Sequence, residues 1–150
     1  MKRLKLFQKF LTEGVVKRVT VNKERPKSLV NESERKLRSL NKQLEKIGVE
    51  NDNANDYVEY CYGIIMYLVR AKLYSEGYNA SGFGAHEAEV SYLRILKFNE
   101  NDVQFADQMR FFRNGMLYYG TILDKEYATK VIEFTKLSYS KMQKELNNLK

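Results

Sequence analysis

The sequence of 150 residues contains few of the residues that build cross-linked, metal-bound or β-rich proteins. A lone cysteine, Cys61, cannot form a disulfide within the chain, and one histidine, His86, leaves a Cys/His zinc site short of ligands. A single proline and eight glycines disfavour a sandwich or barrel, whose many turns need these residues. No run of about 18 uncharged apolar residues is present, so we expect no membrane-spanning helix and no membrane partner.

Charge is plentiful and unevenly distributed. The N-terminal residues MKRLKLFQKFLTEG are charged throughout and lack the apolar stretch of a signal peptide, so the expected location is cytoplasmic. Hydrophobic residues make up 43% of the chain, enough for a core, and the formal net charge is +7. Residues 1–47 hold fourteen Lys/Arg against five Glu, whereas residues 48–112 hold five against ten acidic residues. The basic third suits contacts with phosphates, although solvated lysine-rich helix faces have the same composition.

Apolar residues recur at helical spacing through most of the chain. We expect helices over 2–12, from a start between 22 and 27 to Gly48, over 57–74, over 85–96, from an N-cap at Asn101 to Gly120, and from an N-cap at Asp124 onward. The β-branched segment 15–21 is expected as an extended connector without a strand partner, and 79–84 as a loop. Long helices joined by short loops predict an all-α, antiparallel helical bundle of about five to six helices. We expect one domain over 1–150, with the bundle formed by 22–150.

The helix expected over 57–74 has two faces when projected at 100° per residue. One face is aliphatic and is expected to be buried in the core together with Cys61. The other carries the following residues: Tyr60, Gly63, Tyr67, Arg70 and Tyr74. The composition of this polar-aromatic face fits a half-buried seam as well as a platform for stacked bases.

Motifs of well-known enzyme classes are absent. The sequence contains no GxxxxGK[ST], GxGxxG, GxSxG or HExxH pattern. The glycine-rich segment 81–84 follows a helix rather than a strand, which argues against a phosphate loop. A single histidine cannot supply the ExxH pairs of di-iron bundles, so we expect no metal site and no cofactor.

One polar stripe remains, on the helix expected to end at Gly120. Asp107, Arg110, Asn114 and Tyr118 follow one another at i+3 or i+4 spacing, a line roughly 16 Å long at about 1.5 Å per residue. Arg113 is adjacent to this stripe and long enough to reach the same side. Gly115 costs about 1 kcal/mol relative to alanine inside a helix, which favours a close approach by another group. The alternative, which the residues alone favour, is a solvated stripe in which Asp107 pairs with Arg110 and Tyr118 covers the edge of the core.

Three passages, together with the order of the helices, resemble the HEPN domain (higher eukaryotes and prokaryotes nucleotide-binding). They are Leu73-Tyr74-Ser75-Glu76-Gly77-Tyr78, His86-Glu87-Ala88-Glu89-Val90-Ser91-Tyr92-Leu93 and Arg113-Asn114…Tyr118-Tyr119-Gly120. The resemblance is to small stand-alone prokaryotic and archaeal members and covers residues 22 to 145. It implies a dimeric helical bundle, and in many members a metal-independent ribonuclease of toxin–antitoxin or defence systems. Many prokaryotic members are also encoded beside a minimal nucleotidyltransferase.

The family motif is an arginine, a polar residue and, after a few positions, a histidine. Arg113 and Asn114 match the first two positions, and Tyr118 stands where the histidine is expected, giving R-N-x(3)-Y. A phenol with a pKa near ~10 transfers protons poorly at neutral pH, so ribonuclease activity is expected to be weakened or lost. Arg113 remains suited to a phosphate and Asn114 to a ribose or phosphate oxygen. Tyr118 or Tyr119 is a loose candidate for adenylylation by the partner enzyme.

His86 has two interpretations: a capping or packing residue, or a residue that reaches the cleft of Arg113. The resemblance also implies that the polar-aromatic face and the motif helix contribute to a homodimer interface. The resulting expectation is a cytoplasmic HEPN protein that binds a nucleotide or RNA. Its binding residues are expected to be Arg110, Arg113, Asn114, Tyr118, Tyr119 and His86, of which Arg113, Asn114 and Tyr118 are the catalytic candidates. The alternatives are an active metal-independent endoribonuclease and a structural partner of a minimal nucleotidyltransferase.

Overall fold

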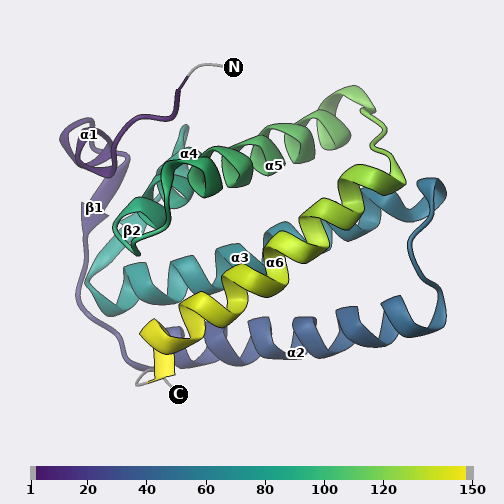
Figure 1. Ribbon diagram of the computed structural model, residues 1–150. Helices are drawn as coiled ribbons and strands as arrows, with labels where there is room; N and C mark the ends of the chain where they lie inside the picture. The colour runs from purple at the N-terminus through teal and green to yellow at the C-terminus, as the bar shows by residue number, and fades with distance from the viewer. Residues whose placement is uncertain (1–2, 148–150) are drawn as a thin grey trace.

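The computed structural model describes residues 3–147 and is an all-α bundle with one small sheet (Figure 1). The elements follow in the order α1 Phe7–Thr12, β1 Val16–Arg18, α2 Glu24–Lys46, a 3₁₀ turn Asn51–Asn53, α3 Ala54–Ser75, β2 Tyr78–Ala80, α4 Ala85–Ser91, a 3₁₀ turn Tyr92–Arg94, α5 Glu100–Tyr119 and α6 Lys125–Leu146. Helix α3 is central: it packs against α2, α5 and α6. None of the helices within residues 3–147 has both the length and the apolar character needed to cross a bilayer.

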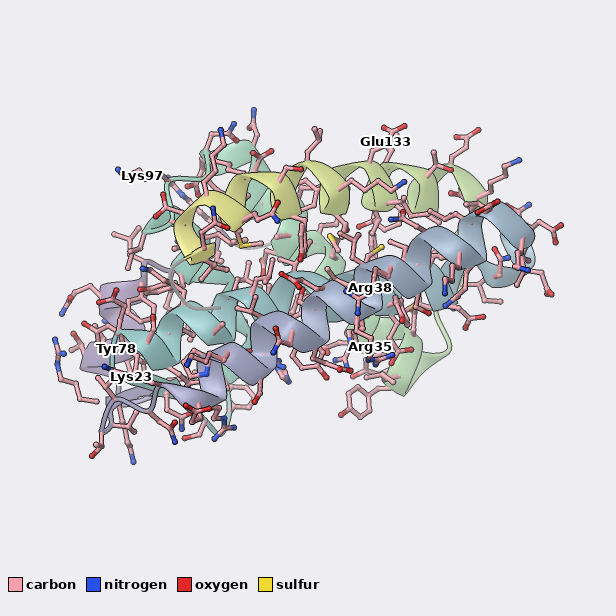
Figure 2. All side chains as sticks on the ribbon, turned by 90° about the horizontal axis from the view of Figure 1, so that it is seen from below. Lys23, Arg35, Arg38, Tyr78, Lys97 and Glu133 are labelled. Atoms are coloured by element: carbon pink, nitrogen blue, oxygen red, sulfur yellow. The ribbon has the colours of Figure 1, made fainter. Side chains whose placement is uncertain are left out.

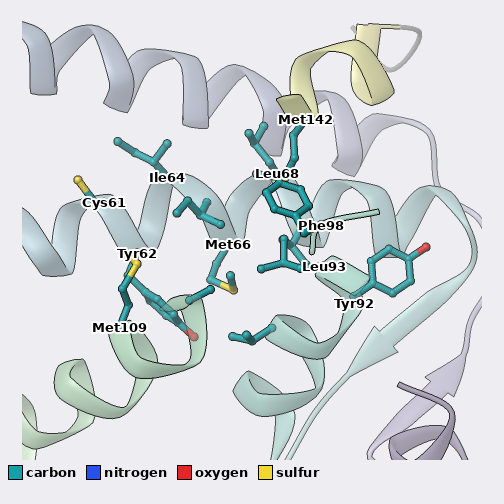
Figure 3. Packing of buried hydrophobic residues seen from close by; sticks show 14 of the residues in the cluster. Cys61, Tyr62, Ile64, Met66, Leu68, Tyr92, Leu93, Phe98, Met109 and Met142 are labelled. Carbon is teal, nitrogen blue, oxygen red and sulfur yellow. The ribbon is translucent and has the colours of Figure 1, made fainter. Parts of the chain in front are cut away.

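Helix α3 lies at the centre because its aliphatic face has no polar residue to expose. Every residue of that face is buried: Val58, Cys61, Ile65, Leu68, Val69 and Leu73. Figure 3 shows Cys61, Ile64 and Leu68 within this cluster. The prediction of a core thiol is confirmed, and burial raises the pKa of Cys61 to about 11.

Helix boundaries follow the local signals in the sequence. Pro26 lies in the first turn of α2, where its missing N–H costs nothing. Gly48 and Gly120 have φ of 73° and 67° after α2 and α5, a left-handed conformation that favours glycine. The Asp124 side chain accepts a hydrogen bond from the Tyr127 N–H and caps α6 as predicted.

The predicted N-cap of α5 is wrong by two residues. The side-chain oxygen of Asn99, not of Asn101, accepts the hydrogen bond from the Asp102 N–H at 2.8 Å. Both positions are asparagine, and the sequence offers no local means of choosing between them. The helix predicted over 85–96 also ends early, at Ser91, and continues as a 3₁₀ turn.

The segment predicted as an unpaired connector, 15–21, contains a three-residue β-strand. Strand β1 pairs antiparallel with β2, Val16 facing Ala80 and Arg18 facing Tyr78, so the predicted loop over 79–84 begins inside a strand. Strand β2 lies some 60 residues further along the chain, after α2 and α3. The residues next to β1 therefore give no sign of its partner. Helix α1 begins at Phe7, later than predicted, and residue 2 of the predicted helix lies outside the described residues.

The N-terminal segment is attached to the bundle by Arg94. Its guanidinium donates to the carbonyl oxygens of Leu4 and Lys5 at 2.8 and 2.7 Å and pairs with Glu100 at 2.7 Å. The hydrogen bond from Arg94 lowers the pKa of Glu100 to about 2, so the pair is charged at neutral pH. Phe7 contributes an apolar contact, with its ring edge-on to Tyr92 at 4.8 Å.

Candidate functional site

A hollow with a volume of about 480 Å³ opens between α2, α3, α4 and α5. It is lined by Lys36 of α2, by Asp56, Glu59, Tyr60, Tyr62, Gly63, Met66, Tyr67 and Arg70 of α3, by His86 of α4 and by Arg113 of α5. The predicted polar-aromatic face of α3 therefore forms its floor, apart from Tyr74. That ring lies elsewhere, under the guanidinium of Arg25 at 4.2 Å.

Gly63 keeps the middle of this floor open. A Cβ atom at Gly63 would meet nothing within 4 Å, so the glycine is not required by a neighbouring backbone. Glycine costs about 1 kcal/mol relative to alanine inside a helix. Tyr60 and Tyr67, three residues before and four after, lie on the same face and bound the gap.

Arg113 is the motif residue that faces the hollow. Its guanidinium lies 5.4 Å from the centre of the Tyr62 ring, within the range of a cation–π contact. Within residues 3–147 no carboxylate forms an ion pair with Arg113 and no carbonyl accepts a hydrogen bond from it. A half-buried arginine with donors still available is suited to an anion.

Arg110 has a different environment. Its guanidinium donates to the Asp107 carboxylate at 2.7 Å and lies 3.9 Å from Glu87, with 12% of the side chain exposed. Asp107 is buried at 2% exposure, so the ion pair is largely shielded from solvent. The structure gives Arg110 the ion pair that the alternative interpretation of the stripe describes. Arg110 does not line the hollow.

The remaining motif residues also lie outside the hollow. Asn114 is half-buried, whereas Tyr118 and Tyr119 are 75% and 86% exposed at the end of α5. Gly115 is explained by the turn that follows: a Cβ there would lie 2.6 Å from the Thr121 hydroxyl oxygen. The close approach expected at Gly115 therefore comes from the chain's own next loop.

His86 lines the hollow with about half of its side chain exposed, and the buried carboxylate of Glu89 orients its ring. Its Nδ1 is 3.2 Å from Glu89, and Arg70 donates to the same carboxylate at 2.6 and 3.1 Å. Burial opposes the charge of Glu89, but the hydrogen bonds from His86 and Arg70 outweigh it and lower the pKa of this carboxyl group. The structure thus brings His86 and Arg113 to one hollow, as the second interpretation of His86 requires.

The hydroxyl of Tyr62 is a buried polar group without a partner. Tyr62 is 4% exposed, and no hydrogen bond to its oxygen exists among residues 3–147. Figure 3 shows the ring in the core beside Met109 of α5. Burial raises the pKa of Tyr62 strongly, so the hydroxyl stays protonated and able to donate.

Charged residues of both signs complete the hollow. The Lys36 ammonium lies 4.4 Å from the ring centre of Tyr60 and 5.9 Å from that of Tyr67. Asp56 and Glu59 are exposed, and neither has an ion pair or side-chain hydrogen bond within the described residues. No group of three or more His, Cys, Asp or Glu in residues 3–147 is arranged to hold a metal ion.

The sequence analysis missed five residues that line the hollow, Lys36, Asp56, Glu59, Tyr62 and Met66, and also Glu89, which pairs with His86 and Arg70. Asp56 and Glu59 extend the spacing of the polar-aromatic face toward the start of α3, a signal that was present in the pattern. Lys36 reaches the hollow from α2, and the spacing of residues along the sequence does not predict which residues of α2 face α3.

Comparisons with known proteins leave the fold and this geometry as the basis for assigning function. No family model, no curated protein and no solved structure matches the chain.

Proposed function

We propose that the hollow binds the phosphate of a nucleotide or an RNA strand through Arg113, in a HEPN-type protein. The observation that carries the proposal is the guanidinium of Arg113, half-buried beside the hollow and unpaired by any carboxylate of the described chain. Arginine binds phosphate through paired N–H donors, and a partly buried site strengthens such charge-assisted bonds.

The rings of Tyr60 and Tyr67 support a ligand that contains a base. They flank the open position at Gly63 and are partly exposed, as stacking requires. Stacking of a base on an aromatic side chain contributes roughly 1–3 kcal/mol. Cations together with exposed rings are the combination found where single-stranded nucleic acids bind.

The proposed setting is a toxin–antitoxin or defence system in which ribonuclease activity is weakened or lost. In support, Tyr118 is a poor proton-transfer group and lies outside the hollow. A homodimer is part of the proposal, as is a minimal nucleotidyltransferase partner. Exposed apolar side chains cluster in sequence near the end of α5, a composition suited to a protein interface. They are Phe111, Leu117, Tyr118, Tyr119 and Ile122.

Replacing Arg113 with alanine tests the proposal. We expect the dissociation constant for 5′-nucleoside monophosphates and a short single-stranded RNA to rise about 10- to 100-fold, because a charged hydrogen-bonding group is lost. Isothermal titration calorimetry measures the change. Arg38→Ala is the matched control, since Arg38 lies on α2 (Figure 2) and is not among the residues that line the hollow. Equal affinities for Arg113→Ala and the parent would refute the assignment.

A second candidate function, metal-independent cleavage of RNA, is favoured by the Glu89–His86 pair. A buried carboxylate that orients an imidazole in the hollow of Arg113 provides a proton-transfer group. The ribose 2′-hydroxyl would lose its proton to His86 and attack the adjacent phosphorus. The bond from phosphorus to the 5′-oxygen breaks, the 5′-oxygen takes a proton from solvent water, and a 2′,3′-cyclic phosphate forms. His86 then releases its proton to the hydroxide left behind, which restores the neutral imidazole.

Incubation of the purified protein with RNA in EDTA decides this second candidate. Cleavage that persists in EDTA, leaves cyclic phosphate ends and falls about 10²- to 10⁴-fold in His86→Ala is the expected result. The product ends are read by mass spectrometry. Absence of cleavage between pH 6 and 9 leaves binding alone as the function.

A further inference from the structure

We infer that the ligand is a single strand of RNA rather than a free nucleotide, and that Arg25 of α2 binds a second phosphate of that strand. This inference rests on the proposed function, because it continues the phosphate contact of Arg113 along α3. It assigns a role to a second hollow and to a cation that the proposed function does not use.

The second hollow has a volume of about 330 Å³ and contains positive charge without a carboxylate. It is lined by Val19, Thr20, Asn22, Arg25, Tyr74 and Asn79. Lys17 of β1 pairs with Asn79 of β2, and residues directly opposite each other in a sheet project from the same face. The exposed side chain of Lys17 therefore adds a second cation beside this hollow.

Arg25 has donors available for an anion. It is exposed, and its guanidinium lies 4.2 Å from the ring centre of Tyr74, within the range of a cation–π contact. No carboxylate of residues 3–147 forms an ion pair with Arg25, and the neighbouring Glu24 lies 3.9 Å from Lys27 instead. The ring thus holds the guanidinium in place and leaves its N–H donors for a phosphate. Arg113 has the same two properties at the first hollow, where it lies over Tyr62.

One face of α3 connects the two hollows. Tyr60 and Tyr67 line the first hollow, Tyr74 lines the second, and the three tyrosines follow one another at intervals of seven residues. A position drifts by only about 20° around a helix in seven residues, so the three rings lie along one line. From Tyr60 to Tyr74 this line is about 21 Å long at ~1.5 Å per residue. All three rings are half-buried and so partly accessible.

The length of this face favours a strand over a mononucleotide. About 21 Å corresponds to about six nucleotides at the ~3.4 Å rise of a stacked strand, and to fewer in an extended one. A mononucleotide reaches only one of the two hollows. A single strand has a phosphate at every nucleotide, so it can place one at Arg25 and another at Arg113 while its bases contact the tyrosines between them.

The carboxylates near the face leave the Arg25 end free for phosphate. Glu32 lies on α2 between Arg25 and Lys36, and Arg35 neutralises it through two hydrogen bonds. Asp56 and Glu59 line the first hollow and precede Tyr60, so they lie at the end of the face that is remote from Arg25. The second hollow is therefore the part of the face where a phosphate meets the least repulsion.

The experiment measures the affinity of the full chain for a uridine dinucleotide and a uridine octanucleotide by calorimetry. We expect the octanucleotide to bind about 100-fold more tightly, since only it engages both hollows at once. In Arg25→Ala its dissociation constant should rise about tenfold, because a charged hydrogen-bonding group is lost. The dinucleotide should lose about twofold or less, because the first hollow remains available to it.

The salt dependence gives a readout that a purely structural role of Arg25 does not change. Each phosphate contact with a single strand contributes about 0.7 to the slope of the logarithm of the binding constant against the logarithm of the salt concentration. Arg25→Ala should lower the slope for the octanucleotide by about this amount. Arg38→Ala is the matched control, an exposed arginine of α2 that lines neither hollow, and should leave affinity and slope unchanged.

An octanucleotide that binds Arg25→Ala and the parent with equal affinity and slope would overturn the inference. The proposed function would then still stand if Arg113→Ala weakens binding of the dinucleotide. If neither oligonucleotide binds the parent protein, the proposed function itself fails.

Discussion

Replacement of Glu89 with alanine is expected to lower the free energy of unfolding by about 3 kcal/mol or more. Glu89 is 6% exposed and accepts both hydrogen bonds from Arg70, whose side chain is 28% exposed. Removing the carboxylate leaves a half-buried guanidinium without its partner, which costs more than the pair contributed. Urea denaturation followed by circular dichroism measures the loss.

The double variant Arg70→Met/Glu89→Leu distinguishes an uncompensated charge from lost packing. Both replacements are apolar and similar in volume, so stability should recover most of the loss seen in Glu89→Ala. A double variant no more stable than Glu89→Ala would contradict the explanation by charge.

The pH dependence of the pair has a definite sign. The pKa of Glu89 is lowered in the folded protein from its ordinary value of 4.5. Its contribution to stability is therefore complete above about pH 4.5 and is lost as the pH falls through the lower folded value. The double variant lacks this carboxylate, and its stability should depend less on pH in that acidic range.

Replacement of Gly63 with leucine is expected to separate binding from stability. The leucine side chain extends into the hollow, where a Cβ atom meets nothing within 4 Å, and leucine is a far better helix former than glycine. Stability should hold or rise by up to about 1 kcal/mol, as it should for Gly63→Ala. Nucleotide affinity should fall about tenfold or more, because the added side chain blocks stacking between Tyr60 and Tyr67.

Gly115→Ala provides the matched control for the helix propensity of glycine. Its Cβ would lie 2.6 Å from the Thr121 hydroxyl oxygen and 3.2 Å from the Thr121 Cβ, so it should not share the gain in stability. Thermal unfolding compares the two alanine variants, and calorimetry measures binding. A Gly63→Leu protein that binds nucleotides as tightly as the parent would show that the ligand does not lie on this floor.

Prediction of the fold succeeded where the signal is local. The period of apolar residues identified the long helices, and Gly48, Gly120 and Asp124 marked their boundaries. It failed for β1, whose partner β2 is remote, because a strand is defined by its neighbour rather than by its own residues. The choice between Asn99 and Asn101 as a cap also escaped prediction, since each has the same local chemistry.

The structure places Arg113 at the hollow and makes the polar-aromatic face of α3, apart from Tyr74, its floor. Spacing on α5 suggested that Asp107, Arg110, Asn114 and Tyr118 act together. Spacing alone does not reveal partners: Arg110 pairs with Asp107, and Tyr118 extends outward at the end of the helix. Residues of one stripe on α5 therefore lie in two different environments, a buried ion pair and an exposed helix end.

The sequence by itself determined which segments are helical, where most of them end, and that α3 has one face for the core and another with tyrosines, a glycine and an arginine. These properties depend on backbone conformation and on periodicity, which act over a few residues. Only the tertiary structure decided that Lys36, His86 and Arg113 meet over that second face, and that Glu89 joins Arg70 to His86. The reason is physical: the packing of separate helices sets which side chains share a hollow, and that packing depends on contacts among residues distant in the chain.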